Sequence, residues 1–489
     1  MRGSRARTVL VGLSAAALFA AGASPAVAAG GSHFARHAPS ETGVVPATPG
    51  ATLWQKRYNG PGNLDDGATS VVVSGDGATV FVTGGGTGLT GGYSFTTLAY
   101  DASTGAPQWT STYDGPSHGY DQATSIGVSP DGSRVFVTGA SRGTGTSLDF
   151  ATVAYDASNG HQLWVKRYTG PGKHVDYATA LGVSTDGAIV FVTGLSPGLG
   201  HRDDYVTLAY NASTGATLWT KRYDGPGHGN DDARALAVSP GGSTIMVTGS
   251  SVGATGDPDY FTVAYDTTTG NKVWGARYNG PGNYVDEAQA VKISPDSSKV
   301  FVTGNSIGTD GGFDYGTVAY NASTGGQLWA RHYSGSAHRD DYGTAVAVSP
   351  NGTAVYVTGF STGVVNRFDY GTVAYNASTG AKLWAKSYNG PDSDTDDAND
   401  IAVSPDASTV VVTGASIGAD HSIDYATVAY DATNAGAQLW VKRFNGAAHH
   451  DDFAYALAIR PDGSAVYVTG ESTASNGFLD FATLAYSLH

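Results

Sequence analysis

Eight aspartates at equivalent points of the sequence could do chemistry together. They recur every 55 residues, with one interval of 56, each just before a β-type segment: Asp66, Asp121, Asp176, Asp231, Asp286, Asp341, Asp396 and Asp452. Carboxylates around a channel mouth could hold a cation or a basic group. Eight uncompensated charges in a low-dielectric channel would repel one another strongly, however. We therefore expect a structural ring, in which each carboxylate accepts hydrogen bonds from the backbone of its own loop.

Six histidines lie a few residues ahead of these aspartates. They come from five repeats: His118, His174, His228, His338, His449 and His450. An imidazole paired with a carboxylate can bind a transition metal or transfer a proton near neutral pH. The spacing does not bring any two of them together. We expect exposed loop histidines that are candidates for ligand binding, with metal or acid–base chemistry as the alternative.

The segment PDSDTDDAND holds a third candidate, formed by Asp392, Asp394 and Asp396. Aspartates at alternate positions are typical of calcium loops with oxygen ligands. Asp397 stands at the sixth position, where an EF-hand requires glycine, and Val403 at the twelfth is not the required glutamate. An EF-hand is excluded, and a calcium site within one repeat remains as an alternative. No other cofactor is predicted.

A repeat positions all of these residues. The tripeptide V-T-G ends at a glycine in each of eight units: Gly84, Gly139, Gly194, Gly249, Gly304, Gly359, Gly414 and Gly470. All eight tryptophans keep the same register: Trp54, Trp109, Trp164, Trp219, Trp274, Trp329, Trp384 and Trp440. Such a period indicates one supersecondary unit per repeat, packed against its neighbours.

Each unit is typical of four β-strands. In one repeat, residues 176–185 alternate small and bulky side chains, and residues 188–194 follow a two-residue turn. Residues 203–210 follow a loop, and residues 216–223 follow the tight turn NASTG. No long window shows the 3.6-residue period of a helix. The sequence predicts an all-β fold, an eight-bladed β-propeller of four-stranded antiparallel blades.

The two ends of the sequence complete one blade between them. The segment GATLWQKRY is a fourth strand without the first three, and the final DFATLAYSLH is a third strand without a fourth. We expect the N-terminal strand to pair in the last blade, which closes the ring and hides its edges. The propeller is predicted over residues 49–489.

The first 28 residues are typical of a signal peptide. Three arginines precede an apolar run over residues 8–23, and AVA at residues 26–28 matches a cleavage site. Residues 29–48 are predicted to form a flexible lead. The sequence contains no cysteine, which excludes a lipid anchor on cysteine and every disulfide. We expect a secreted monomer without a membrane span.

The charge balance narrows the class of partner. The sequence has 27 Lys and Arg against 42 Asp and Glu, a net charge of −15 at pH 7. Removing the three arginines of the signal peptide leaves 24 against 42, or −18. Nucleic acid and anionic membranes would repel such a protein. An extracellular protein or a carbohydrate fits better.

The hairpin before each tryptophan carries the pattern A-x-D-x-x-T-G-x-x-x-W. It is complete in AYDASTGAPQW (residues 99–109) and AYDTTTGNKVW (residues 264–274). Asparagine replaces the aspartate or the threonine elsewhere: Asn211, Asn321, Asn376 and Asn159. This pattern resembles the tryptophan-docking motif of quinoprotein-like (PQQ-like) eight-bladed propellers, and the whole unit, over residues 51–486, resembles the bacterial SBBP repeats. The resemblance implies that each tryptophan packs between blades.

The same resemblance says less about function. Quinoprotein dehydrogenases of this fold add a vicinal disulfide, a tryptophan beneath the cofactor and a calcium site beside a catalytic aspartate. This sequence has no cysteine, and the repeat uses all its tryptophans. Quinone chemistry is therefore not predicted. Other members of the fold are scaffolds that bind proteins.

Sequence variation is confined to one predicted face. The turns SPDG and DASTG recur almost unchanged at one end of the blades, whereas the loops at the other end differ, as in GASRGTGTSLD and GESTASNGFLD. Such a difference marks a binding face. We predict a non-catalytic platform that binds an extracellular protein or carbohydrate through its variable acidic loops. The alternative is a quinoprotein-like or metal-dependent enzyme at the channel mouth.

Two charged residues interrupt the innermost strands. Lys292 and Asp400 stand where other repeats have alanine, glycine or another small side chain. They either line the central channel or are shielded by water. The sequence alone names a partner for neither.

Overall fold

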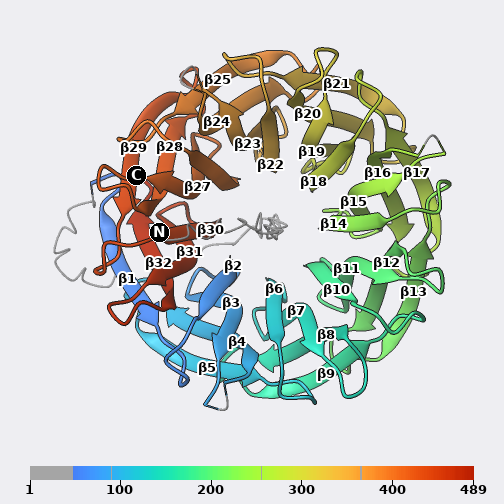
Figure 1. The fold of residues 1–489 in the computed structure, drawn as a ribbon, viewed down its shortest axis with the longest axis vertical. Coiled ribbons are helices and arrows are strands. Elements are labelled where there is room, and N and C mark those ends of the chain that lie inside the picture. The colour runs from blue at the N-terminus through green and yellow to red at the C-terminus, as the bar shows by residue number, and fades with distance from the viewer. Residues whose placement is uncertain (1–47, 90, 255, 364–365) are drawn as a thin grey trace, which may run out of the picture.

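A computed structural model describes residues 48–489, except residue 90, residue 255 and residues 364–365. The predicted signal peptide over residues 1–28 lies outside the described residues, as does the predicted lead up to residue 47. The described chain forms eight four-stranded antiparallel sheets arranged around a central axis as the blades of a propeller (Figure 1). The predicted fold class is confirmed.

Each blade is a meander whose first strand is innermost. Blades 1 and 2 comprise β2 (Gly67–Val73), β3 (Thr79–Thr87), β4 (Tyr93–Asp101), β5 (Pro107–Tyr113), β6 (Asp121–Val128), β7 (Arg134–Arg142), β8 (Leu148–Asp156) and β9 (Gln162–Tyr168). Blades 3 and 4 comprise β10 (Tyr177–Val183), β11 (Ile189–Pro197), β12 (Asp203–Asn211), β13 (Thr217–Tyr223), β14 (Asp231–Val238), β15 (Thr244–Val252), β16 (Pro258–Asp266) and β17 (Lys272–Tyr278).

The second half of the ring repeats this plan. Blades 5 and 6 comprise β18 (Asp286–Ile293), β19 (Lys299–Ile307), β20 (Phe313–Asn321), β21 (Gln327–Tyr333), β22 (Asp341–Val348), β23 (Ala354–Thr362), β24 (Phe368–Asn376) and β25 (Lys382–Tyr388). Blades 7 and 8 comprise β26 (Asp396–Val403), β27 (Thr409–Ile417), β28 (Ile423–Asp431), β29 (Ala437–Phe444), β30 (Asp452–Ile459), β31 (Ala465–Thr473), β32 (Leu479–Ser487) and β1 (Thr52–Tyr58).

Blade 8 is built from both ends of the chain. Strand β1 pairs with β32, in a register that places Thr52 opposite Tyr486 and Tyr58 opposite Phe481. Two further backbone bonds join Ser487 to Gly50 and Ala51, each 2.8 Å long. The first strand (blue) therefore lies beside the last (red) in Figure 1. The predicted closure of the ring is confirmed.

Burial explains the residue types along each blade. The second and third strands are covered on both faces by neighbouring blades, so that β3 is buried except at its first residue. Strands buried on both faces favour continuous runs of β-branched and aromatic residues such as TVFVTG. The outermost strands are half-exposed, and β1 alternates exposed and more buried positions. The hydrophobic core is therefore divided among the spaces between adjacent blades.

The tryptophans hold these spaces together. Trp54 packs between Tyr100 and Tyr467, and its indole N–H donates to the carbonyl of Ala102 in the next blade, at 3.0 Å. Six of the eight indoles donate such a bond to the turn of the following blade. Gly105 completes that turn with φ of 68°, and a Cβ there would lie 2.6 Å from Trp54. Only glycine satisfies both conditions.

A β-bulge in every innermost pair of strands connects blade to blade. In blade 1 the register shifts between Ala68 and Ser70. The intervening Thr69 donates its hydroxyl to the carbonyl of Ala123 in blade 2, at 2.9 Å. The same bond recurs 55 residues later, from Thr124 to the carbonyl of Ala178. In five blades the bulge thus releases a polar side chain that bonds to a backbone carbonyl of the next blade.

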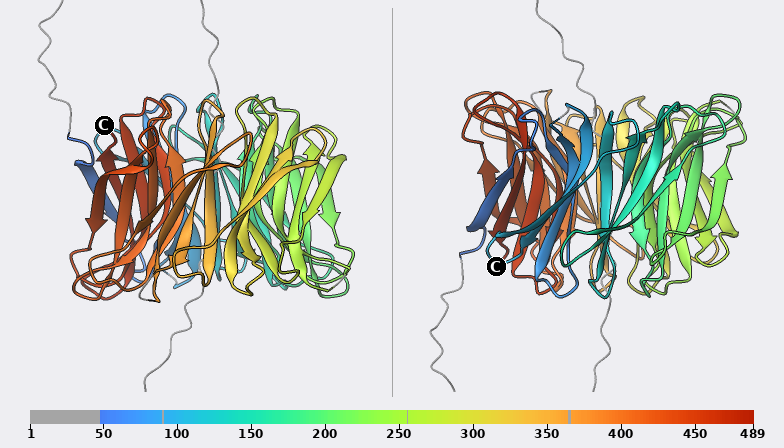
Figure 2. Two further views of the ribbon diagram at one scale, coloured as in Figure 1. Left: turned by 90° about the horizontal axis from the view of Figure 1, so that it is seen from above. Right: turned by 90° about the horizontal axis from the view of Figure 1, so that it is seen from below.

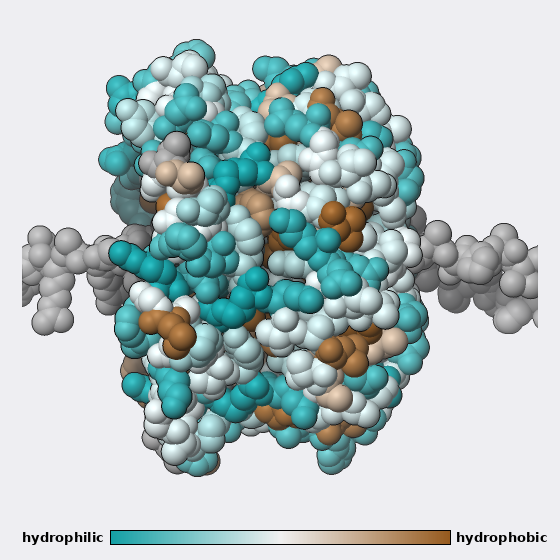
Figure 3. Space-filling view, turned by 90° about the vertical axis from the view of Figure 1, so that its right-hand side faces the viewer, coloured by the Kyte–Doolittle hydropathy of each residue, from teal (hydrophilic) through white to brown (hydrophobic). Residues whose placement is uncertain are grey.

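Two faces of loops flank the blades. Figure 2 shows the strands running between the two ends of a short cylinder, with connections at both ends. One end carries the repeated turns and is called the turn face; the other carries the long variable connections and is called the loop face. Figure 3 shows separate apolar patches on one side of the molecule. The outermost strands of seven blades each carry one exposed large apolar side chain: Leu53, Leu163, Leu218, Val273, Leu328, Leu383 and Leu439. The described residues include no helix long and apolar enough to cross a membrane.

Candidate functional site

The eight repeated aspartates are buried where the innermost strands begin at the loop face. Each is at most 1% exposed. The Asp341 carboxylate accepts one hydrogen bond from the Gly335 amide, at 2.7 Å, and another from the Thr362 amide, at 3.0 Å. The equivalent glycine amide donates to each of the other seven. Each carboxylate therefore joins the loop entering a blade to that blade's first strand.

Burial makes several of these aspartates harder to ionise. It raises the pKa of Asp66 and of Asp396 from 3.8 to about 6, although backbone hydrogen bonds oppose the shift. The same two causes act in the same directions on Asp231 and Asp452. Desolvation disfavours a charged carboxylate unless donors compensate for it. These buried carboxylates therefore fix the backbone of the loop face and are not exposed to a ligand.

The predicted histidines turn to separate partners. The Nδ1 atom of His118 lies 2.6 Å from Asp114, and that of His228 lies 2.8 Å from Asp224, each pair within one exposed loop. The hydrogen bond to Asp114 raises the pKa of His118. His174 contacts His201, a histidine outside the predicted set.

Backbone conformation gives several of the histidines a local role. Four of them occupy equivalent loop positions with φ between 47° and 52°: His118, His228, His338 and His449. Equivalent positions in other blades hold Asn63 and Asn283 with the same sign of φ. Histidine and asparagine are enriched in this left-handed region. His450 is exposed beside His449.

The three aspartates of the predicted calcium loop also turn to separate partners. The Asp392 carboxylate lies 2.7 Å from Nδ1 of His421, and that of Asp394 lies 3.1 Å from Nε of Arg367. The Asp396 carboxylate is buried and accepts a hydrogen bond from Gly390. The structure thus describes two ion pairs and one backbone joint at these positions.

A different set of carboxylates lies close together. Ligand atoms of Asp204, Asp224 and Asp231 are all within 4.8 Å of one another. Arg222 lies 2.7 Å from Asp204, so that its guanidinium already neutralises part of this charge, and His228 pairs with Asp224. The sequence analysis missed this set because its members come from the end of one blade and the start of the next.

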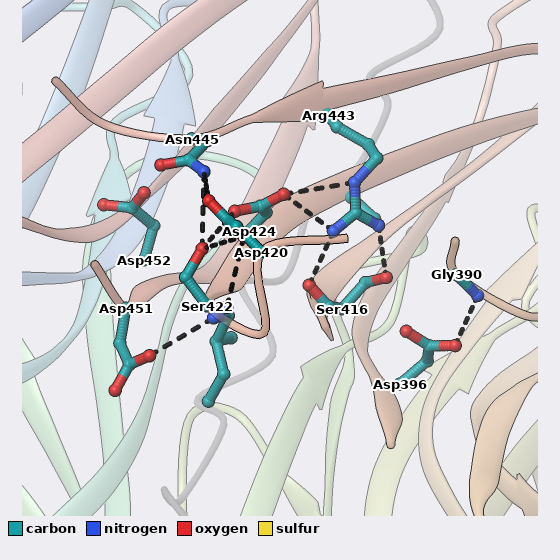
Figure 4. Close-up of polar contacts among 12 residues, drawn as sticks. Gly390, Asp396, Ser416, Asp420, Ser422, Asp424, Arg443, Asn445, Asp451 and Asp452 are labelled. Atoms are coloured by element: carbon teal, nitrogen blue, oxygen red, sulfur yellow. Dashed lines mark hydrogen bonds and ion pairs between the residues drawn. The ribbon is translucent and has the colours of Figure 1, made fainter. Parts of the chain in front are cut away.

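A network around an arginine of the outermost strand was also missed. In blade 7 the guanidinium of Arg443 lies 2.7 Å from Asp424 and donates to the carbonyl of Ser416, at 2.8 Å (Figure 4). It also donates to the hydroxyl of Tyr388 in the preceding blade, at 3.2 Å. Figure 4 shows the neighbouring loop bonds, including that from Asn445 to Asp420. The network ties two blades together below the loop face.

This arginine network varies around the ring. Arginine pairs with aspartate at the equivalent place in four further blades: Arg57, Arg167, Arg222 and Arg277. In blade 5 the arginine is replaced by His332, whose Nδ1 lies 3.4 Å from Asp314. In blade 6 it is replaced by Ser387, which donates to Asp369. Aligning the repeats would reveal these replacements, which is the signal that the sequence analysis did not use.

Lys292 and Asp400 influence each other electrostatically. Asp400 is 8% exposed and accepts hydrogen bonds from the amides of Ile401 and Leu457, at 2.8 and 2.9 Å. Burial raises the pKa of Asp400 to about 6, while the charge of Lys292 opposes that shift. Burial lowers the pKa of Lys292, and the charge of Asp400 opposes that shift in turn. The two repeat-breaking residues, from blades 5 and 7, therefore share one electrostatic environment.

The ring of eight four-stranded blades, closed by both chain ends, defines an eight-bladed β-propeller of the quinoprotein-like class. The chain belongs to the family described as outer membrane protein assembly factor BamB, whose model matches residues 39–192, 94–358 and 150–419. A search of curated proteins finds no match.

Solved structures match this chain at low sequence identity, and those with a TM-score above 0.5 share its fold. Sqt1 from Saccharomyces cerevisiae is 10% identical with a TM-score of 0.58, over 88% of this chain and 98% of that one. The quinohemoprotein alcohol dehydrogenase ADHIIG from Pseudomonas putida HK5 is 14% identical with a TM-score of 0.55, over 90% and 76%. BamB from Moraxella catarrhalis is 16% identical with a TM-score of 0.49, over 89% and 97%.

The residues of this chain do not fit a quinone held as the resemblance implies. The sequence has no cysteine for a vicinal disulfide. Seven of its eight tryptophans are 6–8% exposed, in the spaces between blades. Trp109, the eighth, packs between Phe81 and Tyr155. No indole of the chain is therefore left to stack beneath a planar cofactor in the channel.

Proposed function

We propose that this protein is an exported, monomeric binding platform, which engages an extracellular protein or a carbohydrate through its loop face and catalyses no reaction. The contrast between the two faces carries the proposal. The same repeat supplies both faces, yet the loops of the loop face vary in sequence and include the two most exposed leucines. In repeat proteins, insertions and substitutions on one face are typical of a binding surface.

Two exposed leucines support this choice of face. Leu89 and Leu199 are 85% and 80% exposed, more than any other large apolar side chain among the described residues. Both lie in connections between second and third strands, which the loop face carries. Isolated surface leucines are common, but side chains so fully exposed are available for contact. Protein or glycan contacts would bury them.

The test compares two pairs of leucine substitutions. Purified protein is screened against a glycan array and against soluble exported proteins by surface plasmon resonance. Any ligand found is then measured with the loop-face variant L89D/L199D and the outer-wall variant L218D/L383D. We expect the first to weaken binding at least about tenfold and the second to leave it unchanged. Equal effects of the two variants, or no ligand that the loop-face variant loses, would refute the proposal.

The calcium site at Asp392, Asp394 and Asp396 stays a prediction. It supports the alternative of a metal-dependent enzyme. Elemental analysis of the purified protein, with thermal melts in EDTA and in added Ca²⁺, tests it. A bound ion whose removal lowers the melting temperature would favour the metal-dependent alternative, and an unchanged melt without bound metal would remove it.

A further inference from the structure

Several departures from the repeat lie together where blade 8 meets blade 1, near the loop face. Glu471 in β31 is half-buried. Equivalent positions in the other seven blades carry no charge: Gly85, Ala140, Leu195, Ser250, Asn305, Phe360 and Ala415. One blade has thus acquired a carboxylate at a position that the repeat otherwise keeps neutral.

Glycines of blade 1 make room for this carboxylate. Gly67 and Gly85 face each other across β2 and β3. A Cβ on Gly67 would lie 2.7 Å from Oε2 of Glu471, and a Cβ on Gly85 would overlap the ring of Tyr93. The other blades carry a side chain at the position of Gly67: Gln122, Tyr177, Asp232, Glu287, Tyr342, Asp397 and Phe453. The two glycines therefore fit Glu471 and Tyr93 together.

Two stacked aromatic pairs contribute to the same place. Tyr93 and Tyr120 lie with ring centroids 5.6 Å apart at an interplanar angle of 10°, and Phe453 and Tyr455 lie 6.3 Å apart at 3°. The Tyr455 hydroxyl donates to Glu471, at 2.6 Å. Tyr120 is 42% exposed, so that the cluster opens to solvent.

The cluster carries negative charge without a cationic partner. Burial raises the pKa of Glu471, and the one other charged group that affects it, within the described part of the chain, is a second carboxylate, Asp65. None of the ion pairs between described residues involves Glu471. Burial raises the pKa of Tyr93 and of Tyr455, and the negative charge of Glu471 raises both further. Glu471 thus lies beside Tyr455 and Tyr93, each of which contacts a second aromatic ring, and none of the ion pairs of the described residues involves Glu471.

We propose that Glu471, Tyr455, Tyr93 and Tyr120 bind an organic ammonium group. Aromatic faces attract alkylammonium ions through their quadrupoles, and a nearby carboxylate supplies the full negative charge. The protein's net charge of −15 attracts cations to the mouth over longer distances. This inference rests on the proposed function, since it names the chemistry that the loop face would recognise. The source is either a small quaternary ammonium compound or the side chain of a lysine on a partner.

The test is calorimetric titration of the full chain with three probes. Choline represents a quaternary ammonium, n-butylammonium represents a lysine side chain, and 3,3-dimethylbutan-1-ol is the neutral isostere of choline. We expect a Kd on the order of 1 mM or tighter for at least one ammonium probe and at least tenfold weaker binding of the alcohol. The tighter ammonium probe identifies the source. No binding of either ammonium probe, or equal binding of the alcohol, overturns the proposal.

Variants locate the site. E471Q should weaken ammonium binding about tenfold to a hundredfold, and Y120A should weaken it severalfold. The matched controls are E287Q, a carboxylate of another blade at the channel mouth, and Y284A, an exposed loop tyrosine elsewhere. Both should bind as the unmodified protein does, and all four variants should melt cooperatively. Loss in the controls, or unchanged binding in a folded E471Q, overturns the proposal.

The result can be separated from that of the proposed function. If the ammonium probes fail while L89D/L199D still abolishes binding of a glycan or protein, only this inference is wrong. If choline binds as expected while the leucine variants change nothing, the ammonium site stands and the wider platform does not.

Discussion

The turn face and the loop face use the same residue, aspartate, in opposite ways. On the turn face Asp131 is exposed, and hydrogen bonds from Ser129 and Ser133 lower its pKa to about 2. On the loop face burial raises the pKa of Asp66 and of Asp396 to about 6. The aspartates of both faces fix the backbone conformation of a connection between strands. They differ in whether water reaches the charge.

The contrast shows which hydrogen bonds fix the backbone at each face. A turn-face aspartate is stabilised by hydroxyl and amide donors within its own few residues, so that its turn forms locally. In five blades the loop-face aspartate accepts one bond from an amide of the preceding loop and another from an amide at the end of the second strand. These amides are shielded from solvent, so that water does not replace the carboxylate there. The loop face can therefore vary in sequence between these fixed joints.

The largest expected effect comes from removing a buried joint. D341A would leave the amides of Gly335 and Thr362 without an acceptor in a buried place. We expect a loss of about 3 kcal/mol in the free energy of unfolding, measured by urea denaturation. D341N keeps one acceptor oxygen and should lose less. A loss below about 1 kcal/mol in D341A would mean that the buried loop-face aspartates stabilise the fold no more than the exposed turn-face aspartates do.

The matched change on the turn face should cost less. In D131A, water can reach the donors of Ser129 and Ser133 that Asp131 releases, because the turn is exposed. We expect a loss of about 0.5–1 kcal/mol in the same urea experiment. A loss as large as that of D341A would mean that exposure does not separate the two faces.

A third expected effect is a shift of stability with pH. Asp66, Asp396 and Asp400 have a pKa of about 6 in the folded protein, above the ordinary 3.8. Their contribution to stability is therefore full below about pH 4 and is lost as the pH rises through about 6. We expect the melting temperature to rise by a few degrees from about pH 7.5 to about pH 5.

The turn face should reverse this trend in stronger acid. Asp131 and Asp296 have a pKa lowered to about 2, so their contribution is present above about pH 4 and is lost as the pH falls through about 2. The D400N variant should reduce the change in melting temperature between about pH 5 and about pH 7.5, and should leave the change in stronger acid as it is. A melting temperature that falls steadily from pH 7.5 to pH 5 would contradict the assignment of raised pKa values to the loop face.

The sequence was sufficient for the fold because each repeat states its geometry locally. Eight tryptophans in register, two kinds of tight turn and strands of β-branched residues predict the blade, and the offset between the chain ends predicts closure through β1 and β32. Buried backbone bonding of the eight aspartates was also expected on electrostatic grounds. Such features repeat, so a single unit contains enough information to predict them.

The candidate sites could not be predicted in the same way because they depend on contacts between blades. Asp392 and Asp394 have calcium-loop spacing, yet their partners in the structure are His421 and Arg367. Glu471 becomes a candidate binding residue only because Tyr93, from another blade, lies near it. Residues that differ from their repeat were visible in the sequence, but their neighbours in space were not.

The pairing of β1 with β32 also has a kinetic consequence. Strand β1 is synthesised before β32, and the two are separated by more than four hundred residues. Strand β1 therefore cannot pair until β32 has been synthesised. Contacts of such range slow folding, since a long loop must close before they form. We expect seven blades to assemble before the ring seals. During that interval β32 presents an open edge, and the β1 strand of a neighbouring molecule competes for the same register.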